Sequence, residues 1–343
     1  MTISVTVTTC NRADSLARVL ETLAAQDFPG DDFEVIVSDN GSRDHTRDVA
    51  QAFTNRFTNL RYLFDARPGQ LVGWHRGLAL AQGEITCFID DDSLLAPTWL
   101  AALKEAYADP YVGLVTGPIT LPEERVRPDW LTHLTLGEPG GQTLPFLGLL
   151  DCGGAIRDIP GNFVWGTNFT VRRAVLKEVG GFHPCAMPWR LIRFYGDGEV
   201  HVGRSAAARG HRVLYHPAAA VIHDVHADRL TLDGVYRKFV TSGCARAYQA
   251  LRANDELFPS PSSEEIAAIA MRYFRDEAAA PVELRDAVTR GITDGIDWVR
   301  RGFESDPQFR EWVTRPDYLD LDAAYTHPEL TSQIDTQDWR SGT

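Results

Sequence analysis

Three consecutive aspartates, Asp90, Asp91 and Asp92, directly follow an apolar run that ends at Ile89. Two unit charges about 4 Å apart repel each other by roughly 4 kcal/mol at an effective dielectric constant of about 20, so three ionised carboxylates need a positive partner. Mg²⁺ and Mn²⁺ bind oxygen ligands and commonly join carboxylates to a substrate diphosphate. The triplet therefore predicts a divalent metal site. The alternative is that Asp92 or Ser93 caps a helix in the segment SLLAPTWLAALKEAYAD.

A second pair of carboxylates, Asp197 and Glu199, lies in the segment YGDGEVHVG. A carboxylate beside an attacking hydroxyl group can accept its proton and so act as a general base. The pair also has a structural interpretation, because Asp197 suits a helix N-cap and Glu199 suits a first turn, where the helix dipole favours negative charge. The sequence leaves both interpretations open.

The elements that would position these residues alternate between strand and helix patterns in the N-terminal part of the chain. Leu16, Val19, Leu20 and Leu23 recur at helical spacing between two β-branched runs. Strands that alternate with helices predict an α/β fold with a doubly wound, mostly parallel sheet flanked by helices. We expect strands at 3–9, 33–39, 60–63 and 84–90, and helices at 14–26, 44–57 and 70–82.

Polar residues follow three of the predicted strands, in the segments TTCNRAD, DNGSRDHT and DDDS. Turns alone explain one such cluster. Three clusters favour a binding site, because ligands of these sheets bind outside the carboxyl ends of the strands. The first strand is not followed by G-x-G-x-x-G, and the sequence has no G-x-x-x-x-G-K-[ST] motif. Neither a dinucleotide-binding turn nor a P-loop is therefore supported.

The composition of the chain limits the kinds of binding partner and the location that we expect for the protein. The 343 residues include 34 basic and 47 acidic side chains, a net charge of −13, which argues against nucleic acid as a partner. The five cysteines are scattered and form no Cys-x-x-Cys pair, so neither a disulfide framework nor a zinc ribbon is expected. The N-terminus lacks the features of a signal peptide and no apolar run approaches the ~18 residues of a membrane span. We therefore expect a cytoplasmic protein.

Five segments resemble, in chain order, the successive motifs of family 2 glycosyltransferases of the GT-A fold. They are VTVTTCNRADSLARVLETLAAQ, VIVSDNGSRDHT, GWHRGLALAQGEITCFIDDDSLLAPTWL, GTNFTVRRAVLKEVGGF and ARGHRVLYHPAAAVIH. The resemblance covers residues 2–240. It implies inverting transfer of a sugar from a nucleotide-sugar donor, with Mn²⁺ or Mg²⁺ held by an Asp-x-Asp element. A UDP-sugar is favoured over a GDP- or dTDP-sugar.

The resemblance also implies roles for single residues. Asp90 and Asp92 match the paired aspartates, with Asp92 the better candidate for direct metal contact. His223 matches a position near the diphosphate or its metal, with a purely structural histidine as the alternative. The implied donor-binding positions are Thr9, Arg12, Asp39, Asp44, Arg76, Asp90 and Asp91. For Arg76, an ordinary surface position on a helix is the alternative.

At the position of the general base, the sequence departs from the family's Glu-Asp element. Counting back from Gly210, Glu199 falls at the position of the family's catalytic aspartate, and Asp197 lies two residues earlier. We prefer Glu199 and keep Asp197 as the second candidate.

The chain divides into three expected parts. Residues 1–117 form a nucleotide-sugar-binding half, and 118–230 an acceptor-binding half. The Pro- and Gly-rich stretch 118–161 is read as a long loop, either a lid or a surface insertion. Residues 231–343 form a helical extension. In it Val288, Ile292, Ile296 and Val299 should pack on the core, while membrane-surface binding through WVRR is a minority alternative.

For the acceptor, we expect a hydroxyl group on a saccharide, a lipid-linked molecule or a small molecule. Weak membrane association and a homodimer stay open. Two rival functions are a sugar nucleotidyltransferase and a non-catalytic nucleotide-sugar-binding protein. The first would want a phosphate loop rich in Gly and basic residues after the first strand, which TTCNRAD lacks. The second is kept open by the unusual GDGE segment.

Overall fold

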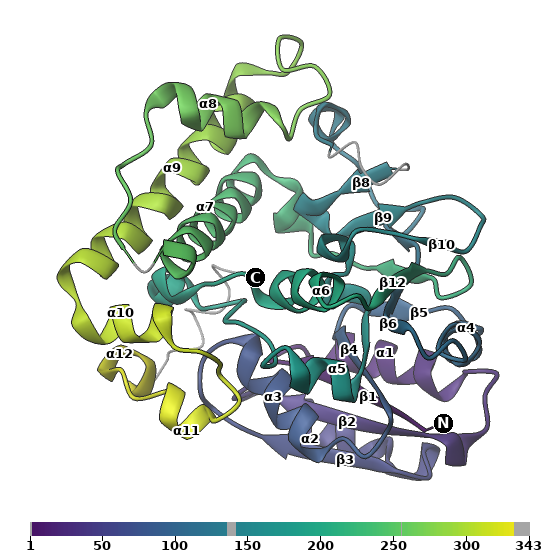
Figure 1. Ribbon diagram of the computed structural model, residues 1–343. Helices are drawn as coiled ribbons and strands as arrows, with labels where there is room; N and C mark the ends of the chain where they lie inside the picture. Colours follow the sequence, from purple (N-terminus) through teal and green to yellow (C-terminus); the bar gives the residue numbers. More distant parts are fainter. Residues whose placement is uncertain (1, 136–141, 255, 333–343) are drawn as a thin grey trace.

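The computed structural model describes residues 2–135, 142–254 and 256–332, and its centre is a sheet of eight strands (Figure 1). The strand order is β10-β12-β6-β11-β4-β1-β2-β3. β1 pairs in parallel with β2 and β4, whereas β11 runs antiparallel between β4 and β6. The mixed, mostly parallel α/β sheet expected from the sequence is confirmed. The strands are β1 (Ile3–Thr9), β2 (Phe33–Asp39), β3 (Leu60–Phe64), β4 (Ile85–Asp90), β6 (Val112–Thr116), β10 (Arg157–Asp158), β11 (Phe169–Arg172) and β12 (Arg212–Tyr215).

The sheet separates two hydrophobic cores, because successive side chains of a strand point to opposite faces. Val5 and Ile89 pack with α1 and α4 in one core. Phe88 and Phe169 pack with α3, α5 and α6 in the other. The helices are α1 (Ala13–Ala24), α2 (Thr46–Ala52), α3 (Gln70–Leu80), α4 (Trp99–Ala106), α5 (Arg173–Glu178) and α6 (Gly198–Ala208). The helix expected at 44–57 is shorter than predicted, because a separate 3₁₀ turn follows it at Thr54–Arg56.

A second sheet has five strands, in the order β5-β13-β7-β9-β8. It corrects two expectations. The residues after the aspartate triplet form a strand, and the next helix begins only at Trp99, so neither Asp92 nor Ser93 caps it. The stretch 118–161 supplies strands as well as loops, because pairing with remote residues satisfies its backbone. The strands are β5 (Ser93–Leu95), β7 (Ile119–Thr120), β8 (Gln142–Leu144), β9 (Leu149–Asp151) and β13 (Val221–His223).

The described part of the C-terminal region, 232–254 and 256–332, is mainly helical, as predicted, and residues 333–343 of the expected extension lie outside the described residues. Helices α7 (Leu232–Asn254) and α9 (Val282–Ser305) lie side by side (Figure 1). Their backbones meet at Gly243 and Gly295, where an added Cβ would lie 2.3 Å from Ile292 O and 2.1 Å from Val240 O. The predicted stripe on α9 is buried in the core. The remaining helices are α8 (Ser263–Met271), α10 (Pro307–Thr314), α11 (Leu321–Ala324) and α12 (Pro328–Thr331).

The WVRR segment on α9 contacts its own chain. Trp298 stacks edge-on against Trp189 with ring centroids 5.5 Å apart, and Arg300 donates a hydrogen bond to Phe258 O. Across the described ranges, each helix is too short or too polar to cross a bilayer.

Candidate active site

The carboxyl ends of β1, β2 and β4 form the edge of the sheet that carries the candidate site. In the parallel register, Thr8 lies opposite Asp90 and Thr9 lies opposite Asp39. The three polar clusters identified in the sequence therefore meet at one edge. The antiparallel pairing of β13 with β5 adds His223, which lies opposite Ser93.

Arg12 and Thr9 bind the second and third aspartates of the triplet. The guanidinium of Arg12 lies 2.9 Å from Asp91 Oδ1 and 2.9 Å from Asp92 Oδ2, and the Thr9 hydroxyl donates to Asp91 Oδ2 at 2.7 Å. Asn11, just before Arg12, has a φ of 54°. Its N–H donates to Ser42 Oγ, which ties the loop after β1 to the loop after β2. Thr9, Asp91 and Asp92 are thus joined with the partly exposed Arg12 in one network.

His223 faces Asp92 with an unusual pairing of atoms. Its Nδ1 lies 2.8 Å from the carbonyl oxygen of Leu147, and because a carbonyl oxygen only accepts, Nδ1 must carry the proton. In the neutral ring, Nε2 then presents a lone pair to Asp92 Oδ1, 3.3 Å away. Both atoms are buried, and neither has a hydrogen-bond partner among the described residues. The repulsion between two facing lone pairs is relieved either by a proton on Nε2 or by a cation bound between or beside the two atoms.

These residues fit a divalent cation. The ligand atoms of Asp90, Asp92 and His223 lie within 4.8 Å of one another. Two carboxylates and one imidazole form a mixed oxygen and nitrogen set that suits Mn²⁺. Burial raises the pKa of both Asp90 and Asp91, that of Asp91 to about 7, because several carboxylates share one dry site. A bound cation would oppose that effect.

Asp39 and Asp44 line the neighbouring loop. Asp39 accepts hydrogen bonds from the Ser42 N–H at 2.8 Å and the Tyr62 hydroxyl at 2.7 Å. Asp44 accepts from the Ala13 N–H and from Thr46, and so joins the starts of α1 and α2. Both carboxylates therefore order the loops that border the site.

Arg76 is not brought to the aspartate triplet. It is half-exposed on α3, and its Nε lies 3.7 Å from Asp65, beyond the end of β3. This arrangement matches the alternative of a surface arginine on a helix.

Glu199 and Asp90 lie against the same backbone residue. Glu199 Oε1 accepts a hydrogen bond from the Gly166 N–H at 3.2 Å. A Cβ placed on Gly166 would lie 3.7 Å from Asp90 Oδ1. The candidate base therefore adjoins the candidate metal ligands, although more than a hundred residues separate them in the chain. Burial raises the pKa of Glu199 above the ordinary glutamate value.

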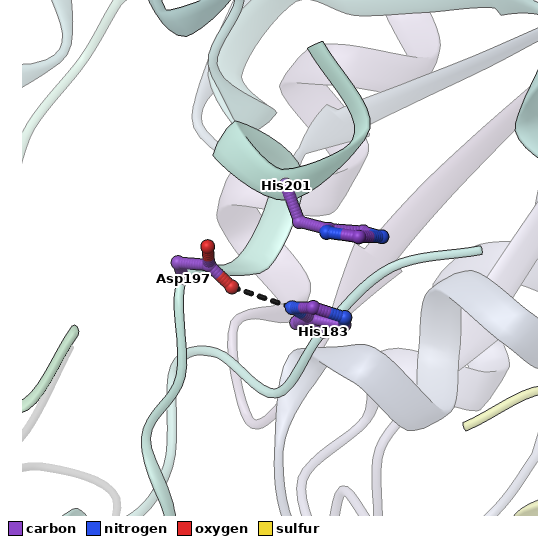
Figure 2. A group of neighbouring side chains, drawn as sticks. All are labelled: His183, Asp197 and His201. Carbon is purple, nitrogen blue, oxygen red and sulfur yellow. Dashed lines mark hydrogen bonds and ion pairs between the residues drawn. The ribbon is translucent and has the colours of Figure 1, made fainter. Parts of the chain in front are cut away.

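Asp197 contacts other side chains, and Figure 2 shows its carboxylate pointing toward His183. It lies at the N-cap position of α6 but makes no capping hydrogen bond. Its oxygens contact His183 Nδ1 at 2.6 Å and the Gln249 amide at 3.0 Å. Burial alone would raise the pKa of Asp197, but the hydrogen bond from His183 outweighs it and the pKa is lowered. The carboxylate is therefore ionised and fully engaged.

Sequence reasoning missed several residues around the site. Gln70 donates hydrogen bonds to Asp90 Oδ1 and to Thr8. Lys238 of α7 is half-buried near Glu199 and Asp90, where burial and Arg229 lower its pKa. No local pattern marks these positions. Gly166 lies within a segment that the resemblance did include, but only the folded chain reveals its contacts.

The chain has the α/β fold of the GT-A class, with a carboxylate cluster and a facing histidine at the strand ends, where ligands of such sheets bind. The sequence profile of Glycosyl transferase family 2 matches residues 4–180, just over half of the chain. The chain belongs to this family.

Individual relatives match over part of the chain. The chain is similar to validoxylamine A glucosyltransferase of Streptomyces hygroscopicus subsp. jinggangensis, with 39% identity over 32% of this chain and 26% of the relative. It is also similar to glycosyltransferase AglE of Haloferax volcanii, with 26% identity over 62% of this chain and 64% of the relative. The chain therefore spans about a quarter of the first protein and less than two thirds of the second.

A solved structure shares the fold across nearly the whole chain. It is S. aureus TarS 1-349 in complex with UDP-GlcNAc, with a TM-score of 0.51, 18% identity, and coverage of 94% of this chain and 89% of TarS 1-349. At this identity the likeness concerns the fold alone.

Proposed function

We propose that the protein transfers a sugar from a nucleotide-sugar donor, with a UDP-sugar favoured, to a hydroxyl acceptor by metal-dependent, inverting single displacement. The observation that carries the proposal is the contact of Glu199 and Asp90 with the same residue, Gly166. A general base next to a metal site is what single displacement requires, because the attacking oxygen loses its proton as the diphosphate departs.

Asp90, Asp92 and His223 would hold Mn²⁺ or Mg²⁺, as their shared ligand geometry supports. A bound metal supplies positive charge that stabilises the departing diphosphate. Arg12 spans Asp91 and Asp92 and fixes both carboxylates before any ligand arrives. Pre-organised charges of this kind need no rearrangement during the reaction.

The nucleotide would bind over the loops after β1 and β2. Thr9, Arg12, Asp39 and Asp44 order these loops, as their hydrogen bonds indicate. A carboxylate oxygen has two lone pairs, so Asp39 can still accept a hydrogen bond from the base or ribose. Because its guanidinium contacts Asp65, we leave Arg76 out of the proposed donor site.

Glu199 would accept the proton in the transfer step. The acceptor oxygen forms a bond to the anomeric carbon from the face opposite the diphosphate, and the bond to the diphosphate oxygen breaks. The proton of the acceptor hydroxyl passes to Glu199, and the nucleoside diphosphate leaves with the bonding electrons. The raised pKa of Glu199 suits this role, since proton transfer is most efficient when the pKa of the base lies near the working pH.

We assign residues 1–117 to donor binding and 118–230 to the acceptor side. The named activity of the relative from Streptomyces makes UDP-glucose the first donor to try. The acceptor is a hydroxyl group of a saccharide, a lipid-linked molecule or a small molecule. Water is a usable acceptor in a first assay, because it too must lose a proton.

The test begins with a thermal-shift screen of UDP-glucose, UDP-GlcNAc and GDP-mannose with Mn²⁺, since a bound donor raises the melting temperature. Hydrolysis of the donor that binds is then followed by release of its nucleoside diphosphate. Glu199→Gln should keep the thermal shift but lower hydrolysis by roughly 10²- to 10⁴-fold, the usual contribution of a general base.

Glu178→Gln is the matched control, because Glu178 is a surface carboxylate of α5 that pairs with His211 and Arg209. It should hydrolyse the donor at the parent rate. A screen in which none of the three donors shifts the melting temperature would count against the function. Parent-rate hydrolysis by Glu199→Gln would remove Glu199 from the mechanism.

A further inference from the structure

The carboxylate of Asp197 joins three separate segments of the chain. Its Oδ1 receives the Nδ1–H of His183, from the loop after α5, at 2.6 Å. Its Oδ2 receives the amide of Gln249, from α7, at 3.0 Å. The Asp197 side chain is only 9% exposed. It is therefore a buried anchor, placed two residues before Glu199.

The backbone around this anchor is equally constrained. The His183 N–H donates to Gly198 O at 3.3 Å, and the Gly196 N–H donates to Pro184 O at 2.9 Å. Gly198 has a φ of +51°, and an added Cβ would lie 3.0 Å from Cys185 Cβ. The turn that leads into Glu199 is thus held in place by the side chain of Asp197 and by backbone hydrogen bonds of Gly196 and Gly198.

The imidazole of His183 is in turn held by its neighbours (Figure 2). The ring of His201 stacks on it with centroids 3.5 Å apart and an angle of 19° between the planes. His201 Nε2 is fixed by Val179 O at 3.0 Å, and the ring of Tyr248 meets His183 edge-on at 5.4 Å. Nearly parallel stacked rings cannot both aim a nitrogen lone pair at one metal ion, so this cluster is better explained as a support than as a second metal site.

We propose that Asp197, held by His183 and Gln249, is a positioning residue that aims Glu199 at the Gly166 edge of the metal site. The inference rests on the proposed role of Glu199 as general base. It also accounts for the two carboxylates of the GDGE segment, because both oxygens of Asp197 are held by His183 and Gln249 and its side chain is only 9% exposed. A shift of about 1 Å in a reacting group can lower a rate by roughly 100-fold, so a small rotation of the first turn of α6 has a measurable effect.

Asp197→Asn is the primary variant. Asparagine offers one oxygen and one NH₂ group, whereas His183 and Gln249 both donate. Either one of the two hydrogen bonds fails, or the proton of His183 moves to Nε2, a buried atom with no hydrogen-bond partner among the described residues. Both outcomes weaken the anchor and let the turn move. With Mn²⁺ and the nucleotide sugar selected by the thermal-shift screen, we expect the kcat of donor hydrolysis to fall roughly 10- to 100-fold while the donor KM changes less than threefold.

Two substitutions of His183 separate the hydrogen bond from general packing. His183→Asn keeps an N–H donor at the position of Nδ1, and should hold kcat within a few-fold of the parent. His183→Leu removes the donor and should lower kcat as Asp197→Asn does. If His183→Leu does not fold, the comparison of Asp197→Asn with His183→Asn still decides the question.

Asp306→Asn is the matched control. It weakens another carboxylate–imidazole pair, Asp306 with His327 at 3.0 Å, which lies in the C-terminal region. It should leave kcat unchanged. Equal losses of kcat in Asp306→Asn and Asp197→Asn would overturn the proposal, as would a parent kcat in Asp197→Asn when Glu199→Gln is impaired. A parent kcat in Glu199→Gln would instead overturn the assignment of the base, and the positioning role with it.

Discussion

Nε2 of His223 lies 3.3 Å from Oδ1 of Asp92, and neither atom has a hydrogen-bond partner in the described ranges of the chain. Leu147 O determines this arrangement, because it forces the proton of the neutral imidazole onto Nδ1. The pair is therefore prepared to share a cation. We therefore propose His223 as a ligand of the metal.

The first prediction concerns that metal. Asp92→Asn and His223→Leu should each lower the affinity for Mn²⁺, measured by titration calorimetry, by roughly 100-fold or more. Chelation should abolish donor hydrolysis, and added Mn²⁺ or Mg²⁺ should restore it. Asp109→Asn, which alters an exposed carboxylate paired with Arg212, should change neither quantity. Full activity in excess chelator would contradict the metal role.

The second prediction concerns the nucleotide. Asp39→Ala should weaken the binding of free UDP about tenfold, which is ~1.4 kcal/mol, because Asp39 orders the loop after β2 and offers an acceptor to the base or ribose. Tyr62→Phe removes only one partner of Asp39 and should have a smaller effect. Titration calorimetry with UDP measures both. An unchanged Kd in Asp39→Ala would place the nucleotide elsewhere.

The third prediction concerns stability and pH at His75. This histidine is buried, donates through Nδ1 to Tyr318 O at 2.7 Å and accepts the Phe182 N–H at Nε2. Burial lowers its pKa from 6.5 to about 4. Between pH 4 and pH 6.5, His75 is therefore protonated in the unfolded chain and neutral in the folded chain. The free energy of unfolding falls as the pH drops from 6.5 towards 4, by about 3 kcal/mol in all.

Urea unfolding at several pH values tests this effect. Glutamine has both an N–H donor and an oxygen acceptor but does not titrate, so His75→Gln should lose less stability than the parent between pH 7 and pH 4. His45→Gln is the control, since the His45 side chain is 60% exposed and should leave the pH dependence unchanged. Identical pH dependence in His75→Gln and the parent would show that His75 is protonated in the folded state.

The fourth prediction concerns Gly69, which precedes Gln70. An added Cβ would lie 2.5 Å from Met187 Sδ and 3.4 Å from the hydroxyl of Tyr325, a C-terminal residue that also donates to Pro68 O. Gly69→Ala should therefore destabilise the protein through both its positive φ and overpacking, the latter by roughly 1–3 kcal/mol. It should also weaken Mn²⁺ binding, because Gln70 holds Asp90.

Gly153→Ala provides the matched control. Gly153 has a φ of +85°, close to the +98° of Gly69, but nothing lies within 4 Å of its added Cβ. The difference between the two variants in urea unfolding isolates the packing against Met187 and Tyr325. Equal destabilisation would mean that the C-terminal region does not support the start of α3.

The sequence by itself determined the features that depend on local periodicity. The β-branched runs predicted β1 and β2 with the bounds that the structure has, and the apolar stripe on α9 predicted its buried face. Side chains in a regular helix or strand repeat with a fixed period, so the sequence alone indicates which face of the element packs on the core. Polar segments directly after three predicted strands also indicated one binding edge, because ligands of such sheets bind outside the carboxyl ends of the strands.

Only the tertiary structure decided what depends on remote partners. The short strand β5 exists because it pairs with β13, more than a hundred residues away, and a sequence window there reads as the start of a helix. The tautomer of His223 is set by Leu147 O, and the fold makes His183 and Gln249 the hydrogen-bond partners of Asp197. A carboxylate in GDGE has the same intrinsic chemistry whether it acts as a general base or as a structural anchor. Which of the two it becomes is settled by the groups that the fold places within hydrogen-bond distance of it.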